Sequence, residues 1–372
     1  MIQDVSTLLR HLISMPSLSG EESEIADFVE SWTREAGLDV GRVEDNVFCS
    51  IGQGATTLLL NSHLDVVPPS KDHPFNPFDP VVGGERIFGR GAVDAKASGA
   101  AMLMAALNLS KTGWQPENGK LIVALTACEE TPRPKNGLQT LLPHLPALDG
   151  AVVGEPTSLL PCFSQKGLLI LEVTAHGKSA HAARPEEGKN AIAQAAMDIA
   201  ALENMTFGRV HPQLGAVTKV VTTITGGSAR NVIPERCYFV IDLRTTPSYT
   251  HSEIIEKVRA TLVSDVEVSS ERYVPTETPA GSVIATAVRL ALPEATPFGS
   301  PTVSDWAFLG PVPAVKLGPG DSTLSHTGQE SIAIAELEQA VSLYEAVVRH
   351  FFDAASATTN RGEQSYALEE GR

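Results

Sequence analysis

One pattern occurs three times along the chain: an apolar run of strand length is followed by acidic or histidine side chains. The runs lie at 58–60, 121–125 and 151–153, and the polar residues after them are His63 with Asp65, Glu129 with Glu130, and Glu155. Short apolar runs of this kind are typical of buried strands. In an open α/β sheet, strand ends meet at one edge, where such sheets bind ligands. The pattern therefore predicts a sheet with a polar site along one edge.

The order of the expected strands and helices predicts the fold class. An amphipathic helical stretch spans residues 5–36 and is broken at Pro16–Gly20. Strands are then expected at 39–43, 47–51, 57–61, 120–127 and 151–153, and helices at 95–109 and 137–142. Alternation of strands and helices indicates a sheet covered on both faces. We therefore predict an α/β domain built on a doubly wound mixed sheet.

After residues 165–167 the pattern changes to that of an α+β segment. Strands are expected at 168–176, 215–225 and 237–244, and helices at 191–203 and 251–262, before the first pattern resumes at 282–291. A chain of 372 residues is long enough for two domains. We predict a discontinuous domain of residues 1–165 and 275–353, an inserted domain of residues 166–274, and a polar tail of residues 354–372 that is disordered.

Composition narrows the classes of partner and compartment. The formal net charge is −16 and there is no long basic run, so nucleic acid and anionic membrane surfaces are excluded as partners. The N-terminus lacks the pattern of a signal peptide, and no apolar stretch approaches the roughly 20 residues that span a bilayer. Cys49, Cys128, Cys162 and Cys237 show no CxxC spacing and are expected to be reduced, buried thiols. We expect a soluble, cytoplasmic protein.

The adjacent carboxylates of Glu129 and Glu130 point to chemistry at the strand edge. Like charges side by side raise each other's proton affinity unless a cation neutralises one of them. One carboxylate would then bind a metal ion, and the other would stay free to move a proton. The alternative is a solvated strand end that enters the turn at 131–134.

Four further residues are candidate metal ligands: His63, Asp94, Glu155 and His326. Imidazole and carboxylate groups are ligands that Zn²⁺ and similar ions take. Each residue also has an ordinary structural interpretation, respectively a core histidine, a helix N-cap, a loop residue fixed by the following proline, and a surface imidazole. Their joint placement after successive strands favours a metal site.

Five motifs together resemble the metallopeptidase M20 family, the group of acetylornithine deacetylases, succinyl-diaminopimelate desuccinylases, aminoacylases and glutamate carboxypeptidases. The motifs are His63-x-Asp65, Gly89-Arg-Gly-x-x-Asp94-x-Lys96, Glu129-Glu130, Glu155-Pro-Thr157, and Gly320-Asp321 followed by His326-Thr-x-x-Glu330. The resemblance extends from about Val5 to about Phe352. Ala95, Ala97 and the segment Ser304-Asp305-Trp306 depart from the usual family pattern, which leaves the shape of the substrate pocket open.

The resemblance implies a centre of two divalent metal ions, with Zn²⁺ as the first expectation and Co²⁺ or Mn²⁺ as alternatives. One ion would be bound by His63, Asp94 and Glu155, and the other by Asp94, Glu130 and His326. Asp94 would bridge the ions. Glu129 would be the general base, and Asp65 would orient His63 by accepting its other ring N–H.

The same resemblance implies that the inserted domain is a lid or dimerisation domain of a homodimer. His181 would reach the active site of the partner subunit and stabilise the oxyanion. Asn231 and Arg244 would hold the α-carboxylate of the substrate, since a guanidinium binds a carboxylate through two hydrogen bonds. Gly320 would contact the substrate backbone. Without the family, a surface arginine explains Arg244 about equally well, an ordinary loop histidine is the stronger interpretation of His181, and turn geometry alone explains Gly320.

The activity implied is metal-dependent hydrolysis of the linear amide bond of an N-acyl-L-amino acid, with acetylornithine-type deacetylation in arginine biosynthesis first. The alternatives are an N-succinyl-diaminopimelate desuccinylase, a lysine-pathway deacylase, and a small carboxypeptidase or dipeptidase. A metal-binding or scaffold protein without activity is the alternative from another class. It would lack a ligand or the base, whereas in this chain all of these positions are filled.

Overall fold

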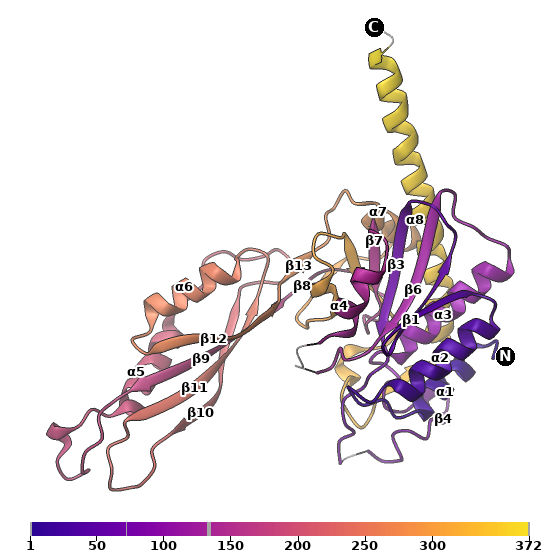
Figure 1. Ribbon diagram of the computed structural model, residues 1–372. Helices are drawn as coiled ribbons and strands as arrows, with labels where there is room; N and C mark the ends of the chain where they lie inside the picture. The colour runs from indigo at the N-terminus through magenta and orange to yellow at the C-terminus, as the bar shows by residue number, and fades with distance from the viewer. Residues whose placement is uncertain (1, 72, 132–134, 371–372) are drawn as a thin grey trace. The chain divides into compact units, whose positions relative to one another are not determined.

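The computed structural model describes residues 2–71, 73–131 and 135–370, with side chains up to Ala357 in the last helix. The chain divides into two compact units (Figure 1). The first comprises Met1–Phe163, Thr278–Phe298 and Ser304–Arg372, and the second comprises Ser164–Glu277 and Gly299–Val303. Both contain strands and helices, and the α/β fold class with a large mixed sheet is confirmed.

The first unit is organised around a mixed sheet. The strand order of this sheet is β1 (Asp39–Val43), β2 (Asn46–Ile51), β6 (Gly119–Thr126), β3 (Thr56–His63), β7 (Gly150–Val153), β15 (Ala314–Lys316), β8 (Cys162–Gln165) and β13 (Thr276–Glu277), with β14 (Phe298–Ser300) paired to β8. Of these strands, β13 and the ends of β8 and β14 are counted in the second unit. The central strands β6, β3, β7 and β15 are parallel, whereas β1, β2 and β8 pair antiparallel. The carboxyl ends of β6, β3 and β7 therefore lie at the same edge.

Both faces of this sheet are covered, which explains the nearly continuous apolar runs. Leu58 and Leu60 belong to one core and Leu59 belongs to another, because successive side chains of a strand point to opposite faces. The first core also contains side chains of α1 (Val5–Ser14), α2 (Ser23–Glu35), α3 (Lys96–Lys111), α7 (Val283–Ala291) and α8 (Ile334–Glu370). The second core contains side chains of α4 (Gly137–Leu141) and η3 (Asp305–Phe308).

Small residues let α3 approach the sheet closely. Gly154, directly after β7, has no room for a side chain, because an added Cβ would lie 2.6 Å from Met102 Cε and 2.8 Å from Ser98 Cβ of α3. The fit is less tight at Gly99 of α3, where an added Cβ would lie 3.0 Å from Leu125 Cδ2, the flexible end of a side chain of β6. The N-terminus of α3, which follows Asp94, is thereby fixed near the ends of the strands.

A second, small sheet in the first unit was not expected from the sequence. It has the order β16 (Ser331–Ala333), β5 (Arg86–Phe88), β4 (Val81–Gly83). Three residues are too few to show an alternating pattern, so no periodicity announces these strands. The pairing of β16 with β5 is antiparallel and brings the segment around residue 330 beside the segment around residue 90.

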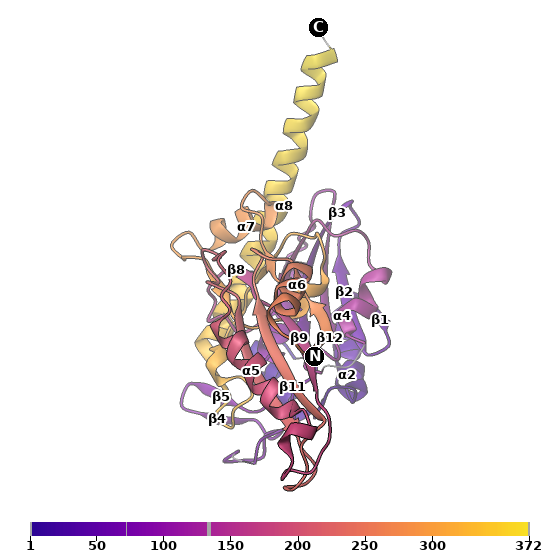
Figure 2. The same cartoon turned by 90° about the vertical axis from the view of Figure 1, so that its left-hand side faces the viewer.

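The second unit is a four-stranded antiparallel sheet with two helices on one face (Figure 2). The strand order is β10 (Thr218–Gly226), β11 (Arg236–Thr245), β9 (Gly167–His176), β12 (Asp265–Tyr273), and the helices are α5 (Ala191–Asn204) and α6 (His251–Thr261). In β9 and β11 buried residues alternate with more exposed ones, as expected for a sheet covered on one face. The strand β12 was not predicted.

The last helix of the chain runs into the tail segment 354–372. Helix α8 continues from Ile334 to Glu370 and contains most of the segment that we expected to be unstructured. Residues 371–372 lie outside the described part. Ala and Glu, which are good helix formers, account for seven of the 19 residues of 354–372, and extending an existing helix is far easier than starting one.

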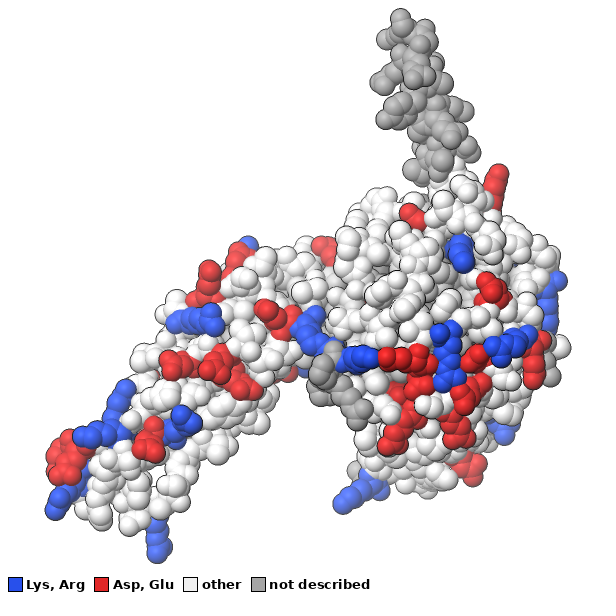
Figure 3. All heavy atoms as spheres, viewed as in Figure 1, with Lys and Arg blue, Asp and Glu red and all other residues white. Residues whose placement is uncertain are grey.

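The surface agrees with an acidic chain. On the face shown in Figure 3, acidic and basic side chains are intermingled and form no extended basic area. Arg42, for example, pairs with Asp27, Glu30 and Asp45. In the described part of the chain, no helix combines the length and apolarity needed to cross a membrane.

Candidate metal centre

The predicted metal ligands lie at one edge of the sheet of the first unit. His63 is the last residue of β3, Glu130 follows β6, and Glu155 follows β7. Asp94 lies just before α3, and His326 lies in the loop after η4 (Ser322–Leu324). Three of the five ligands are therefore placed by parallel strands, and the other two come from segments that only the tertiary structure brings to this edge. Of the turn expected at 131–134, residues 132–134 lie outside the described part.

The carboxylate of Asp94 lies between two imidazoles. Its Oδ1 is 3.2 Å from His63 Nε2, and its Oδ2 is 3.5 Å from His326 Nε2. Each imidazole also faces a second carboxylate, since His63 Nε2 is 4.0 Å from Glu155 Oε1 and His326 Nε2 is 2.8 Å from Glu130 Oε1. Two sets of three donors thus share Asp94, and they have the composition expected for a pair of metal sites.

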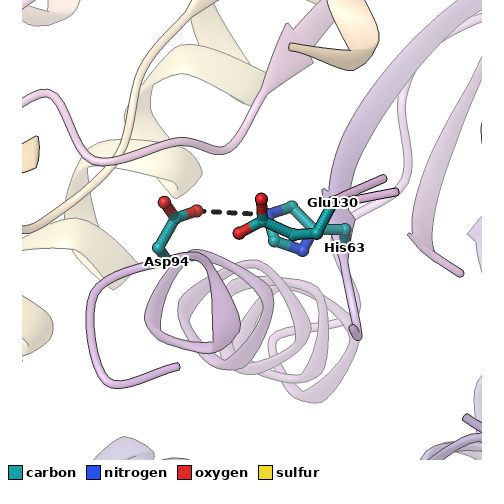
Figure 4. A group of neighbouring side chains, drawn as sticks. All are labelled: His63, Asp94 and Glu130. Atoms are coloured by element: carbon teal, nitrogen blue, oxygen red, sulfur yellow. Dashed lines mark hydrogen bonds and ion pairs between the residues drawn. The ribbon is translucent and has the colours of Figure 1, made fainter. Parts of the chain in front are cut away.

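Figure 4 shows three of these side chains directed toward one another. One donor atom from each of His63, Asp94 and Glu130 lies within 4.8 Å of the others. Imidazole nitrogen and carboxylate oxygen in such a group are the donors that divalent transition metals take.

The electrostatics of the site show a shortage of positive charge. Burial, together with the nearby Asp94, raises the pKa of Glu155 to about 8. Burial and the charge of Glu155 raise the pKa of Glu129 well above its usual range. Burial also raises the pKa of Glu130, although its hydrogen bond with His326 opposes the shift. Divalent cations would reverse these shifts, because they stabilise the charged carboxylates. The residues present therefore fit a metal centre.

His63 and Asp94 show the opposite tendency because they are paired with each other. Burial alone would lower the pKa of His63, but hydrogen bonds with Asp65 and Asp94 raise it well above its usual range. Burial alone would raise the pKa of Asp94, but His63 and His326 hold it low. The neighbouring carboxylates therefore raise the pKa of both imidazoles, His63 and His326.

Glu129 differs from its neighbour in its surroundings. Within the described part of the chain, its carboxylate has no hydrogen bond, whereas that of Glu130 is bonded to His326. The backbone of both residues is held by Asp65, whose Oδ1 and Oδ2 accept the N–H groups of Glu129 and Glu130 at 3.0 Å each. The two adjacent carboxylates thus have different surroundings, although one residue holds the backbone of both.

Asp65 contacts His63 differently from the expectation. His63 Nδ1 is 2.9 Å from the main-chain carbonyl oxygen of Asp65 and 3.5 Å from its Oδ1. The carbonyl is the closer acceptor, because the carboxylate is already turned toward the N–H groups of residues 129 and 130. Asp65 still faces the ring nitrogen of His63 that points away from Asp94.

Three buried carboxylates near the site received no role from the sequence: Glu22, Asp305 and Glu330, each 1% exposed. Glu22 Oε1 accepts the N–H of Cys128 at 3.0 Å. Together with the contacts of Asp65 to Glu129 and Glu130, three successive N–H groups are thus bound by buried carboxylates. Asp305 accepts hydrogen bonds from Asn61, Thr126 and Asn136. The sequence offered one signal for Asp305 and Glu330, because both lie in segments that were compared with the family pattern.

The predicted residues of the second unit lie at exposed or half-buried positions. His181 is exposed, and its Nδ1 accepts the N–H of Ala183 at 3.0 Å. Asn231 is exposed. The guanidinium of Arg244 is paired with Asp242, with Nε at 2.9 Å from Oδ1 and Nη2 at 3.2 Å from Oδ2.

Gly320 is a turn residue of the first unit. Its φ is +98°, which favours glycine, and an added Cβ would lie 2.9 Å from Val93 Cγ1. Its N–H donates to Glu336 Oε1 and its carbonyl accepts the N–H of Ser158, both at 2.8 Å. These contacts favour the turn interpretation over a substrate contact.

Known proteins resemble this chain in both sequence and fold. A model of peptidase family M20/M25/M40 matches residues 59–350. A succinyl-diaminopimelate desuccinylase of Wolbachia pipientis wMel is 27% identical over 383 residues, which cover 96% of each chain. An acetylornithine deacetylase of Myxococcus xanthus is 32% identical over 321 residues, which cover 81% of each chain. A dinuclear metal-binding peptidase of the M20 family from Bacillus subtilis aligns with a TM-score of 0.72 at 18% identity and covers 92% of this chain and 97% of that chain.

Proposed function

The chain belongs to peptidase family M20/M25/M40, as its motifs predicted, and from this premise we propose that it is a metal-dependent hydrolase of the linear amide bond of an N-acyl-L-amino acid. The observation that supports this most strongly is the position of Asp94 between His63 with Glu155 and His326 with Glu130. A carboxylate shared by two imidazole–carboxylate sets suits a bridging ligand.

The metal ligands in this proposal are those expected from the motifs. His63, Asp94 and Glu155 would hold one ion, and Asp94, Glu130 and His326 the other, with Zn²⁺ preferred and Co²⁺ or Mn²⁺ as alternatives. Such ions polarise a bound carbonyl and lower the pKa of a bound water. The uncompensated carboxylates of the site provide the charge that divalent ions need.

Glu129 is the proton carrier in this mechanism. Its carboxylate lacks a described hydrogen bond, and its raised pKa means that it holds a proton more firmly than an exposed carboxylate does. It would accept a proton from the attacking water and pass it to the nitrogen of the leaving amine. General acid–base transfer of this kind contributes about 10²–10⁴ in rate.

Residues of the second unit would bind the substrate and stabilise the developing oxyanion. In this proposal Arg244 and Asn231 hold the α-carboxylate. Asp242 occupies Nε and Nη2 of Arg244, and Nη1 has no described partner. His181 Nδ1 is used as an acceptor, so its proton would lie on Nε2, where it could be donated to an oxyanion.

The assembly in this proposal is a homodimer formed through the second unit, with His181 acting on the site of the partner. Strand β10 is an edge strand, and its residues Val220 and Ile224 are 57% and 53% exposed. Met197 of α5 is 60% exposed. Edge strands with exposed apolar residues are normally covered by another chain or protected by charge.

Two acyl groups are the leading candidates. N-acetylornithine-type substrates come first from the sequence motifs, and the relative from Myxococcus xanthus carries the corresponding name. N-succinyl-diaminopimelate is the second candidate, because the relative from Wolbachia pipientis and others of similar length are named desuccinylases. A succinyl group carries a carboxylate that an acetyl group lacks, so the two acyl groups differ by one negative charge.

Turnover of a substrate panel tests the proposal. The metal-free protein would be assayed with N-acetyl, N-succinyl and dipeptide substrates after addition of Zn²⁺, Co²⁺ or Mn²⁺. Activity that requires metal and is highest on one acyl class would support the proposal and identify the acyl group. Two tightly bound ions without activity on any acylated amino acid or dipeptide would favour the noncatalytic alternative.

A further inference from the structure

An arginine and a glutamate that the mechanism does not use form a buried ion pair behind the metal centre. Arg90 follows β5 and Glu330 precedes β16, and each is 1% exposed. Arg90 Nη1 lies 2.6 Å from Glu330 Oε2. Removing both charges from water costs about as much as their attraction returns, so stability alone is a weak reason for such a pair.

The Glu330 carboxylate holds the segment that carries Asp94. Its Oε1 accepts the main-chain N–H of Val93 at 2.9 Å and that of Asp94 at 3.0 Å. Two successive N–H groups bound to one oxygen fix the orientation of the peptide units before α3. The position of the shared carboxylate of Asp94 therefore depends on Glu330.

The guanidinium of Arg90 reaches the segment that carries the other ligand. Its Nη2 lies 3.4 Å from the carbonyl oxygen of His326 and 3.3 Å from Nε2 of His73. Through the ion pair, the backbones of Asp94 and His326 are joined by a chain of three contacts. No strand pairing does this, because neither residue belongs to a strand.

The arrangement has a counterpart on the other side of the site. There, Asp65 accepts the N–H groups of Glu129 and Glu130, one on each carboxylate oxygen. In both places a buried carboxylate holds two successive N–H groups of a segment that carries a candidate ligand. The recurrence of this contact indicates a function in placing ligands.

We propose that Arg90 and Glu330 are positioning residues that fix the spacing between Asp94 and His326, and so determine how tightly the ion shared by these two ligands is held. The inference rests on the proposed metal centre. Neither residue contacts the substrate or the metal, and both act through the main chain. Loss of partners that orient metal ligands typically costs about 10–100-fold in metal affinity or activity.

Two variants break the link at different points. In Glu330→Gln the oxygen can still accept the N–H groups of Val93 and Asp94, but an amide NH₂ would face the guanidinium of Arg90. In Arg90→Lys the charge is kept, but a single ammonium cannot reach both Glu330 and the carbonyl of His326. The matched control is Arg86→Lys. Arg86 donates hydrogen bonds to Ser331 of β16, next to Glu330, but does not contact the segments that carry Asp94 and His326.

The experiment measures Zn²⁺ binding to the metal-free proteins by competition with a chromophoric chelator, alongside thermal unfolding of the same metal-free samples. We expect Glu330→Gln and Arg90→Lys each to weaken one of the two binding steps about 10–100-fold and the other step much less. The double variant should resemble the single ones, because both break the same link. Arg86→Lys should bind both ions as the wild type does.

Unchanged Zn²⁺ affinity in both variants would overturn the inference and leave the pair with a purely structural role, whatever the effect on thermal unfolding. If one variant does not fold, the other still decides the question. A wild-type protein that binds no Zn²⁺, Co²⁺ or Mn²⁺ would contradict the proposed function instead, and the two failures are thus distinguishable.

Discussion

At the scale of single residues, the site separates side chains that the sequence presents as equivalent. Glu129 and Glu130 are neighbours, yet Glu130 Oε1 lies 2.8 Å from His326 Nε2 and Glu129 has no described hydrogen bond. The reason is the turn after β6, in which Asp65 holds both N–H groups. The backbone thus directs the Glu130 carboxylate to His326 and leaves that of Glu129 without a described hydrogen bond, which suits the proposed role of Glu129 in proton transfer.

The proposed role of Glu129 predicts that Glu129→Gln keeps both metal ions and loses about 10²–10⁴ in kcat. The amide has the same shape but cannot carry a proton between water and amine. Metal content by elemental analysis and steady-state kinetics would check this. The matched variant Glu130→Gln should instead lose metal. Retained turnover in metal-loaded Glu129→Gln would contradict the assignment of the base.

Glu155 gives a pH dependence with a definite sign. Burial and Asp94 raise its pKa in the folded, metal-free protein to about 8, compared with the ordinary glutamate value of 4.5. A raised pKa means that the folded state binds the proton more tightly than the unfolded state does. This contribution to stability is therefore complete below about pH 4.5 and is lost as the pH rises to about 8.

We therefore expect metal-free Glu155→Gln to be more stable than the metal-free wild type at about pH 8, since the neutral amide avoids the buried charge. The difference should shrink toward about pH 5, where the native carboxyl is protonated. Thermal unfolding across this pH range would measure it. With saturating Zn²⁺ at about pH 8, the wild type should instead be more stable than Glu155→Gln, because the carboxylate is then a ligand. A pH-independent difference would contradict burial of the Glu155 charge as the cause.

At the scale of elements, strand ends and close helix packing build the site. The parallel strands β3, β6 and β7 bring three ligands to one edge, and α3 brings Asp94 there because small residues allow it to lie close to the sheet. The ligand geometry therefore depends on how near α3 can approach β7.

Substitution of Gly154 tests this packing. In Gly154→Ala the new Cβ would meet Ser98 Cβ at 2.8 Å, and α3 would have to move, so we expect a loss of about 1–3 kcal/mol in the free energy of unfolding. Gly99→Ala is the matched control, because it meets only the flexible end of Leu125 and gains helix propensity. Urea denaturation would compare them. Equal effects would contradict the packing argument.

At the scale of the whole molecule, the chain has two units with separate cores. One core combines residues of β9 and β11 with residues of α5 and α6, all from the second unit. The five candidate metal ligands all belong to the first unit. The division allows the ligand set and the proposed dimer surface to be changed independently.

The proposed dimer predicts that Ile224→Lys on β10 shifts the protein from dimer to monomer. In a twofold interface the new charge would face the same region of its own copy. Light scattering after gel filtration would measure the mass, and Zn²⁺ binding should be unchanged. Val263→Lys is the control, because Val263 is 75% exposed but lies outside the edge strand. A monomeric wild type would contradict the proposal.

The sequence by itself determined the alternation of strands and helices, the apolar runs that form the central strands, and the identity of the candidate ligands. These properties are local, since they depend on periodicity and on motifs within a few residues. The three-residue strands β4, β5 and β16 carry too little periodicity to be recognised.

Only the tertiary structure decided how the ligands meet. His326 and Asp94 are brought together through the small sheet and the pair formed by Arg90 and Glu330, which no local pattern reveals. The same holds for Asp65, whose carboxylate accepts the N–H groups of residues 129 and 130 while its main-chain carbonyl oxygen is the closer acceptor for His63. The physical reason is that a buried polar group takes whichever partner the fold places within hydrogen-bond distance, and that distance is a property of the packed chain.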